Sequence, residues 1–295
     1  MIEVEDLHKR YRHQKAVDGL SFTARPGEVT GFLGPNGAGK TTTIDMILGL
    51  AQPDGGEARI TGKPFRELEN PAGTMSAVLA GGAFHDRRSA RASLHATAAA
   101  AGLPTSRIGE VLEAVGLGDA PNRHVGAYSL GMRQRLSLAQ ALLGDPDVLI
   151  LDEPGNGLDP AGLKWLRDTL RGLAHDQGKT VMLSSHILSE VQETVDVAVV
   201  IAEGALMSEF SLAEADAGQH VVIARSPKAE ELQAAVERGG EAKVARSGDE
   251  LRITGSSASR VGELALEIGV ALSGLRAEHR SLEEHYMELT QGRGR

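Results

Sequence analysis

A glycine-rich segment between an apolar run and a helical pattern carries the clearest chemical signal in the sequence. It follows Val29–Leu33 and precedes Thr43–Leu50. Glycines let the backbone curl so that successive N–H groups point at phosphate oxygens, and the helix start adds its positive dipole end. We therefore interpret the segment as a phosphate-binding loop and not as a plain strand-to-helix turn. It consists of Gly34, Pro35, Asn36, Gly37, Ala38, Gly39, Lys40, Thr41 and Thr42.

Two adjacent carboxylates at the end of a second apolar run indicate where a bound phosphate could react. Asp152 and Glu153 directly follow Val148–Leu151. Side chains alternate along a strand, so Asp152 can face a metal ion while Glu153 faces an attacking water molecule. In the loop, Lys40 would reach the β- and γ-phosphates, and the Thr41 hydroxyl would bind Mg²⁺ together with Asp152. The alternative is that the acidic pair simply begins a solvated loop.

Composition limits the classes of protein that need consideration. The chain has 295 residues, of which 41% are hydrophobic and 24% charged, a mixture typical of folded globular domains. Its formal net charge of −9 gives no general attraction to nucleic acid, which we do not expect as a partner. The absence of cysteine excludes disulfides and thiolate chemistry. Residues 1–6 are acidic and lack the apolar core of a secretion signal.

The order of the elements that must position these residues predicts an α/β fold. Strand patterns at Ile2–Leu7, Leu20–Ala24 and Arg59–Thr61 give a β-rich beginning around the phosphate loop. Apolar runs after residue 147 then alternate with helical stretches, an arrangement typical of parallel sheets. An alanine-rich helical region from Ala90 to Gly116 interrupts this order, within an insertion of about residues 85–145. The later runs are Val148–Leu151, Thr180–Ser184 and Val197–Ile201.

The composition changes after Phe210, and we expect a small α+β accessory domain over residues 213–295. Its pattern is strand, helix, two strands and helix, which suggests a split βαβ arrangement without a clear last strand. A terminal helix begins at Ser281, where the spacing to Glu284 fits a capping box. His279 and His285 in this tail have no metal-binding neighbours. The predicted elements are His220–Ala224, Ala229–Arg238, Ala242–Ala245, Leu251–Thr254 and Ala258–Ile268.

The order of motifs in residues 2–210 resembles that of the ATP-binding-cassette (ABC) ATPases. Between the loop and the acidic strand lies a Ser-Leu-Gly-Met-Arg-Gln-Arg signature that begins at Ser129, and a histidine follows at His186. The resemblance implies a P-loop NTPase fold of the ABC type. This fold has a mixed sheet, an N-terminal antiparallel β part and a helical insertion. We expect it to span residues 1–212.

The resemblance also implies roles for individual residues. Tyr11 looks like the aromatic residue that stacks on adenine, although it can also be a turn tyrosine. Ser129 and Gly131 match the signature residues that contact the γ-phosphate of an opposite subunit, although Ser129 also fits a plain helix N-cap. Asp159, an N-cap before Pro160, matches a dimer-contact position. His186 resembles the histidine that contacts the γ-phosphate and orients water.

One departure from the family pattern is chemically important. Where the family usually has a glutamine that binds Mg²⁺ and positions water, this sequence places Ala80, and no glutamine occurs between Gln52 and Gln134. An alanine can do neither. We therefore expect weakened hydrolysis or altered coupling. Met132 and Gly155 also differ from the usual residues, and both changes look tolerable.

The resemblance implies a mechanism in which two copies meet head to tail and enclose two Mg-ATP. Glu153 then acts as general base, while Lys40, Mg²⁺ and His186 stabilise the transferring phosphoryl group. The single phosphate loop and the signature are similar to those of bacterial drug and antibiotic exporters whose permease is a separate chain. No apolar run approaches the roughly 18 residues needed to span a bilayer, so we expect a cytoplasmic protein held at the inner face of the membrane. The alternatives are a soluble non-transport ABC ATPase and a nucleotide-gated protein with weak hydrolysis.

Overall fold

Two compact units make up the chain. In the computed structural model, placement is described for residues 1–12, 14–79, 84–187, 192–212, 221–239 and 242–278. The units are Met1–Glu209 and Phe210–Arg295, a division that lies close to the boundary predicted after residue 212. All residues named as candidate site residues belong to the first unit.

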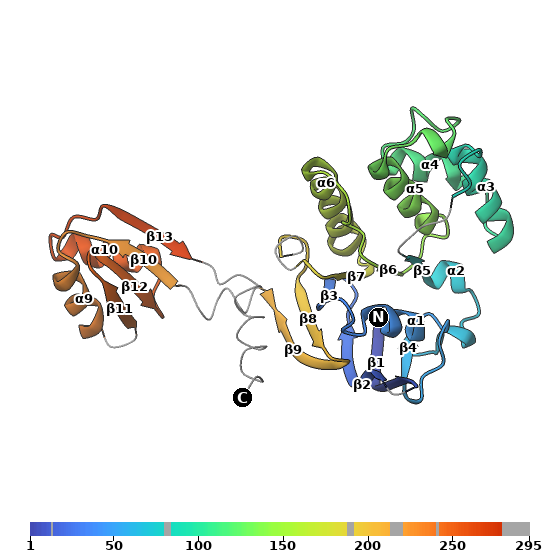
Figure 1. Ribbon diagram of the computed structural model, residues 1–295. Coiled ribbons are helices and arrows are strands. Elements are labelled where there is room, and N and C mark those ends of the chain that lie inside the picture. The colour runs from blue at the N-terminus through green and yellow to red at the C-terminus, as the bar shows by residue number, and fades with distance from the viewer. Residues whose placement is uncertain (13, 80–83, 188–191, 213–220, 240–241, 279–295) are drawn as a thin grey trace. The chain divides into compact units, whose positions relative to one another are not determined.

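The first unit begins with a three-stranded antiparallel sheet in the order β2-β1-β4 (Figure 1). Ile2 in the central strand pairs with Ala24 on one side and Ile60 on the other. Apolar side chains alternate with exposed polar ones along β1, so only one face is buried, as expected of an antiparallel sheet with one wet face. The strands are β1 (Ile2–Tyr11), β2 (Gln14–Ala24) and β4 (Gly55–Ile60).

A six-stranded sheet in the order β5-β6-β7-β3-β8-β9 forms the centre of this unit. The neighbouring strands from β5 to β8 pair in parallel. All residues of β3 and β6 are buried, because helices and the second sheet cover both faces of a parallel sheet. The strands are β3 (Val29–Leu33), β5 (Met75–Val78), β6 (Val148–Leu151), β7 (Thr180–Ser185), β8 (Val197–Ala202) and β9 (Ala205–Ser211).

The main hydrophobic core lies between the two sheets and includes the helix that follows the phosphate loop. Phe22 of β2 stacks on Phe32 of β3 with ring centroids 5.0 Å apart. Ile44 and Ile47 of α1 are fully or almost fully buried in the same cluster. Each such side chain contributes about 1.5–3 kcal/mol on burial, so the core fixes the position of α1 and of the loop before it.

In Figure 1, α6 and the group of α3, α4 and α5, which forms the predicted insertion, lie on one side of the six-stranded sheet, and α1 lies on the other side, toward the three-stranded sheet. Gly102, in the left-handed conformation with φ 65°, ends α3. Short 3₁₀ turns occur at Phe65–Glu67 and Val125–Ala127, and a π-helical turn at Gly172–Asp176. The helices are α1 (Lys40–Ile47), α2 (Pro71–Thr74), α3 (Ala90–Ala101), α4 (Arg107–Ala114), α5 (Leu130–Leu142) and α6 (Pro160–Arg171).

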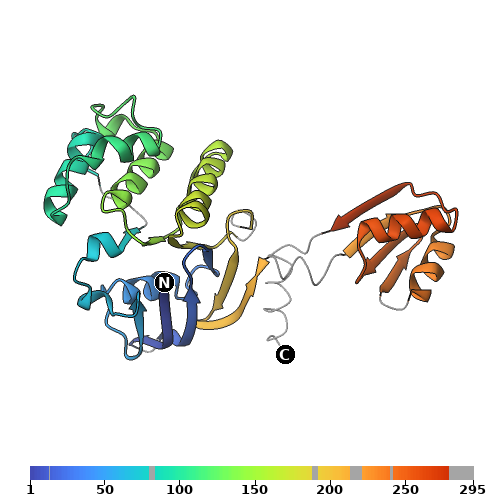
Figure 2. The ribbon, with the colours of Figure 1, turned by 180° about the vertical axis from the view of Figure 1, so that it is seen from behind.

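The second unit is a four-stranded antiparallel sheet in the order β11-β12-β10-β13 with two helices (Figure 2). Val222, Leu251 and Ile253 of the sheet form a core with Leu232 and Val261 of the helices. The element order is strand, helix, strand, strand, helix, strand. The elements are β10 (Val221–Arg225), α9 (Ala229–Arg238), β11 (Lys243–Ser247), β12 (Glu250–Thr254), α10 (Ala258–Glu267) and β13 (Gly274–Glu278).

Two strands of the structure were not expected from the sequence, and one expected helix lies outside the described residues. The second unit has the last strand that the sequence pattern did not indicate, because β13 begins with a glycine and its sequence, Gly-Leu-Arg-Ala-Glu, has a weak strand pattern. β9 was also not predicted. The terminal helix expected from Ser281, with His279 and His285, lies outside the described residues. Among the helices that the structure describes, we find none with the length and apolar character that a bilayer crossing requires.

Candidate nucleotide-binding site

The loop between β3 and α1 needs glycine at particular positions for steric reasons. A Cβ atom on Gly34 would lie 2.4 Å from the Ile201 carbonyl oxygen, and one on Gly39 would lie 2.4 Å from the Ala16 carbonyl oxygen. Gly39 is also left-handed, with φ 104°, at the N-cap of α1. The close approach of these backbones therefore sets the loop immediately above the start of the helix, where free N–H groups attract anions.

Lys40, the first residue of α1, is held under the loop. Its side chain is 6% exposed, and Nζ donates to the carbonyl oxygens of Gly34 at 2.7 Å and Pro35 at 3.3 Å. The same nitrogen lies 3.3 Å from Glu153 Oε1. A phosphate bound in the loop would therefore compete with Glu153 for this buried ammonium group.

The acidic residues after β6 lie opposite this loop. Asp152 is 5% exposed, and its Oδ2 atom lies 3.5 Å from Thr41 Oγ1. Its backbone N–H donates to the Val78 carbonyl oxygen at 2.8 Å. A hydroxyl and a carboxylate oxygen facing one another are the hard ligands that Mg²⁺ prefers when substrate phosphates complete its shell. The residues present therefore fit the ion that the sequence led us to expect.

The backbone conformation at Glu153, and not the alternation of side chains along a strand, directs its side chain into the cleft. β6 ends at Leu151, and Glu153 has a positive φ of 51°, which is strained for a residue with a side chain. Its Oε2 atom lies 2.7 Å from His186 Nδ1. The two carboxylates thus separate because the chain turns left-handed at Glu153, and not because the strand continues.

These side chains surround one open cleft of about 480 Å³. Sequence reasoning did not identify Gln14, Ala16 and Asn156, which also line it, because they belong to no phosphate-binding motif. Gly34 and Ala38 are not part of its lining, since Gly34 packs against Ile201 and Ala38 is buried. The predicted residues that line the cleft are Tyr11, Asn36, Gly37, Gly39, Lys40, Thr41, Thr42, Asp152, Glu153 and His186.

Tyr11 lies at the end of β1 and contributes an aromatic ring to the cleft. The residue is 50% exposed, and Lys9 Nζ lies 5.5 Å from the ring centroid. An exposed ring costs free energy in water, and a flat aromatic ligand would cover it. The position therefore suits a nucleobase.

The signature residues lie elsewhere. Ser129 caps α5 by accepting from the Met132 N–H at 3.2 Å, and Asp159 caps α6 by accepting from the Gly162 N–H at 2.7 Å. Neither they nor Gly131 line the cleft of their own chain. The two caps are neighbours, because a Cβ on Gly131 would lie 3.7 Å from Leu158 Cδ2.

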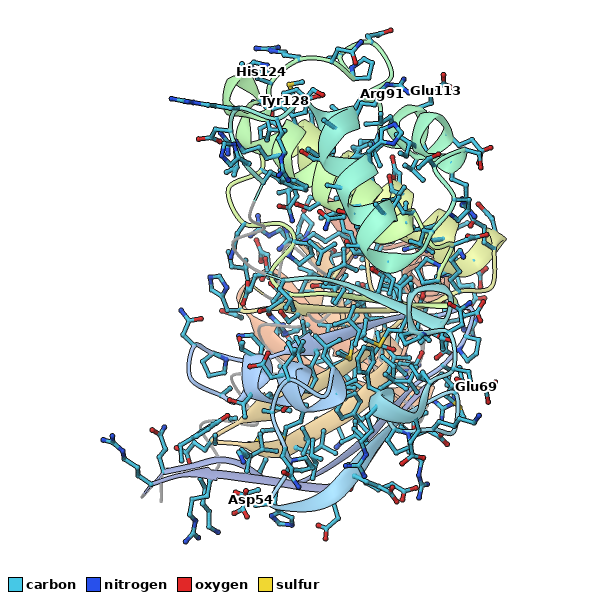
Figure 3. The ribbon with its side chains drawn as sticks, turned by 90° about the vertical axis from the view of Figure 1, so that its right-hand side faces the viewer. Asp54, Glu69, Arg91, Glu113, His124 and Tyr128 are labelled. Carbon is cyan, nitrogen blue, oxygen red and sulfur yellow. The ribbon has the colours of Figure 1, made fainter. Side chains whose placement is uncertain are left out.

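The helical insertion holds the signature in place. Just before it, Tyr128 Oη donates to the Ala120 carbonyl oxygen at 2.7 Å, and burial raises the pKa of this phenol. Figure 3 shows Tyr128 in the insertion, at the opposite end of the unit from Asp54. Arg135 lies 4.0 Å above the Trp165 ring of α6 and donates to the Val115 carbonyl oxygen at 2.9 Å. α5 and α6, and with them the two caps, are therefore joined by direct contacts.

Two further observations concern the surroundings of the cleft. Burial, together with the nearby Asp152 charge, raises the pKa of Asp45. Ala80, which stands where a glutamine was expected, lies outside the described residues.

The parallel sheet and the phosphate loop that leads into α1 define a P-loop nucleoside triphosphatase. Residues 17–156 match the family described as ABC transporter, and residues 220–283 match a domain of unknown function (DUF8746). The chain is 44% identical over 215 residues to the bacitracin transport ATP-binding protein BcrA of Bacillus licheniformis, covering 71% of this chain and 69% of that protein. It is 37% identical over 240 residues to the Nod factor export ATP-binding protein I of Burkholderia pseudomallei, covering 79% of each.

The fold agrees with these relatives. A solved ATP-binding subunit of an ABC transporter superposes with a TM-score of 0.65 at 26% identity, covering 74% of this chain and 92% of that one. The chain belongs to the ATP-binding proteins of ABC transporters. It is an ATPase of the P-loop class, as the order of its motifs predicted.

Proposed function

We propose that the chain is the motor subunit of an exporter and couples Mg-ATP hydrolysis to transport through a separate permease at the inner face of the cell membrane. Two relatives support this proposal, because one is named for bacitracin transport and the other for Nod factor export, and the second name gives the direction of transport. The observation that carries the proposal is the cluster of Lys40, Asp152, Glu153 and His186 around one cleft.

Each residue of the cluster has a distinct task. The phosphate loop and Lys40 hold the triphosphate, and Tyr11 covers the adenine. Thr41 and Asp152 would hold Mg²⁺, which would offset phosphate charge when bound. Glu153 takes the proton of the attacking water, and His186 orients Glu153 through the 2.7 Å contact. The position of Lys40 beside Glu153 then places the base next to the phosphate that is cleaved.

The cleft is open to solvent, and the signature residues of the same chain do not line it. A second copy arranged head to tail would bring its Ser129 and Gly131 to the cleft, with the N–H groups at the start of its α5 facing the γ-phosphate. The Gly157-Leu158-Asp159 segment, which lies beside the signature, would then contact the other copy at the dimer interface. We therefore propose an ATP-dependent homodimer.

The dimer and the coupling can be tested separately. Light scattering of the purified chain should show a monomer without nucleotide and a dimer with Mg-ATP once hydrolysis is blocked. A monomer under both conditions would contradict the head-to-tail arrangement. For coupling, the chain is co-purified with its permease and reconstituted in liposomes, where the ATPase activity should rise relative to that of the isolated chain. An activity that the permease does not change would contradict a motor role.

A second candidate rests on Ala80. Without a glutamine at this position, the chain would act mainly as a nucleotide-gated switch that hydrolyses ATP slowly. A phosphate-release assay on the purified chain distinguishes the two, because a switch binds ATP tightly and releases almost no phosphate on the time scale of transport.

A further inference from the structure

Ser184 connects the two carboxylates of the site, although it does not line the cleft. It lies near the end of β7 and is completely buried. β7 pairs in parallel with β6, with Leu183 opposite Leu151, so Ser184 lies beside the residues that follow β6. The neighbouring strand thus brings a hydroxyl group to the point where β6 ends and the turn at Glu153 begins.

The hydroxyl of Ser184 makes two hydrogen bonds at once. It donates to Asp152 Oδ1 at 2.5 Å and accepts from the backbone N–H of Glu153 at 2.9 Å. A short bond to a carboxylate oxygen is of the strong, charge-assisted kind. With both roles filled, the Ser184 side chain has one orientation in which every polar group is satisfied.

The first bond decides which oxygen of Asp152 is presented to a metal ion. Because Oδ1 is held by Ser184, Oδ2 is the oxygen that faces Thr41 Oγ1, 3.5 Å away. Hydrogen bonds of this kind fix the orientation of a metal-binding carboxylate, which would otherwise rotate about its side-chain bonds.

The second bond supports the strained turn. Glu153 has a φ of 51°, and such a conformation persists only where the surroundings hold it. Its N–H is directed at Ser184 Oγ and its carboxylate at His186, so the backbone and the side chain are fixed from two directions.

We propose that Ser184 is a positioning residue that sets the metal-facing oxygen of Asp152 and the left-handed turn of Glu153 with a single hydroxyl group. The inference rests on the proposed role of Asp152 in binding Mg²⁺. It assigns a function to a residue that does not line the cleft.

The test compares Ser184→Ala with a conservative and a matched variant. Ser184→Thr keeps the hydroxyl group. Thr30→Val removes another fully buried hydroxyl of the same sheet, and Thr30 Oγ1 has no hydrogen-bond partner among the residues that the structure describes, so its loss should leave the site unaffected. Binding of Mn²⁺ to the protein in the presence of ADP is followed by electron paramagnetic resonance of the free ion. ADP binding in EDTA and the ATPase rate are measured alongside.

We expect Ser184→Ala to weaken Mn²⁺ binding by about 10-fold, the lower end of the usual effect for residues that orient metal ligands. ADP binding in EDTA should stay within about twofold of the parent, because the phosphate loop is unchanged. Ser184→Thr should restore Mn²⁺ binding, and Thr30→Val should match the parent. Turnover of Ser184→Ala at saturating metal should remain reduced, because the Glu153 turn has lost its partner.

Unchanged Mn²⁺ binding in Ser184→Ala would overturn the inference while leaving the proposed function intact. If the parent protein itself binds no Mn²⁺ with ADP, the proposed metal site is wrong and the inference falls with it. Should Ser184→Ala not fold, Ser184→Cys takes its place, because it keeps the shape of the side chain and replaces the hydroxyl with a weak donor. Equal losses of Mn²⁺ binding and of metal-free ADP binding would indicate a merely structural role and would also overturn the inference.

Discussion

Replacing Glu153 with glutamine removes one charge from the site and changes little else. The carboxylate lies 2.7 Å from His186 Nδ1 and 3.3 Å from Lys40 Nζ. A glutamine side chain has nearly the same size, and its amide oxygen can still accept from either partner. It cannot take a proton from water, so the variant tests the general base and not the shape of the cleft.

The expected loss of turnover follows from the role of the residue. A positioned general base contributes roughly 10²–10⁴-fold, which corresponds to about 3–5 kcal/mol of transition-state stabilisation. The affinity for nucleotide, in contrast, should not fall. The attraction between Lys40 and Glu153 at 3.3 Å is about 5 kcal/mol at an effective dielectric constant of 20, before desolvation is subtracted. Because ATP competes with this contact for the lysine, Glu153→Gln should bind ATP at least as tightly as the parent.

The assay combines phosphate release with equilibrium titration of ATP. Glu203→Gln is a matched control, because Glu203 has the same φ of 51° but is exposed in the turn between β8 and β9 and does not line the cleft. This control should hydrolyse ATP at the parent rate. Turnover of Glu153→Gln within about threefold of the parent, with ATP bound, would refute the assignment of Glu153 as general base, since even a weak general base contributes about 10²-fold.

Three more predictions concern the loop, the departure from the family pattern and the stability of the first unit. Lys40→Ala should weaken ATP binding by roughly 10–100-fold, since each hydrogen bond to a charged group contributes about 1.5–3 kcal/mol; an unchanged dissociation constant in a titration would contradict the phosphate-loop assignment. Ala80→Gln should raise the ATPase rate, and an unaltered rate would remove the idea that the missing glutamine limits hydrolysis. Hydrogen bonds from Lys179 and Arg107 hold the pKa of Asp145 below its usual range. The resulting stabilisation is present above the unfolded pKa of about 3.9 and is lost as the pH falls through the lowered folded value. Asp145→Asn should therefore lower the free energy of unfolding at pH 7 by up to about 1 kcal/mol and leave it unchanged near pH 2, as measured by urea unfolding. An equal loss at both pH values would show that the charge of Asp145 is not the cause.

The sequence was informative wherever a local rule has a strong physical basis. Continuous apolar runs located β3 and β6 with the bounds that the structure has, because buried parallel strands admit little else. The glycine-rich segment before Lys40 identified the phosphate loop, because few backbones other than one rich in glycine can curl around an anion. Capping residues located the starts of α5 and α6, since Ser129 and Asp159 each satisfy a free N–H group there.

Local rules failed where the deciding contact came from elsewhere in the chain. β13 begins with a glycine and has a weak strand pattern, and it becomes a strand because β10 pairs with it along its whole length. Glu153 was placed by strand alternation, whereas the structure turns its backbone left-handed.

By itself, the sequence determined the loop, the acidic pair and the family to which the chain belongs, because each depends on neighbouring residues. Only the tertiary structure decided that Ser184 joins Asp152 to Glu153, a contact across 32 positions that arises from the pairing of β6 with β7. It likewise showed that Ser129 lies away from the cleft of its own chain. Distances between strands and helices that are remote in sequence depend on how the sheet and core pack, and no local pattern encodes them.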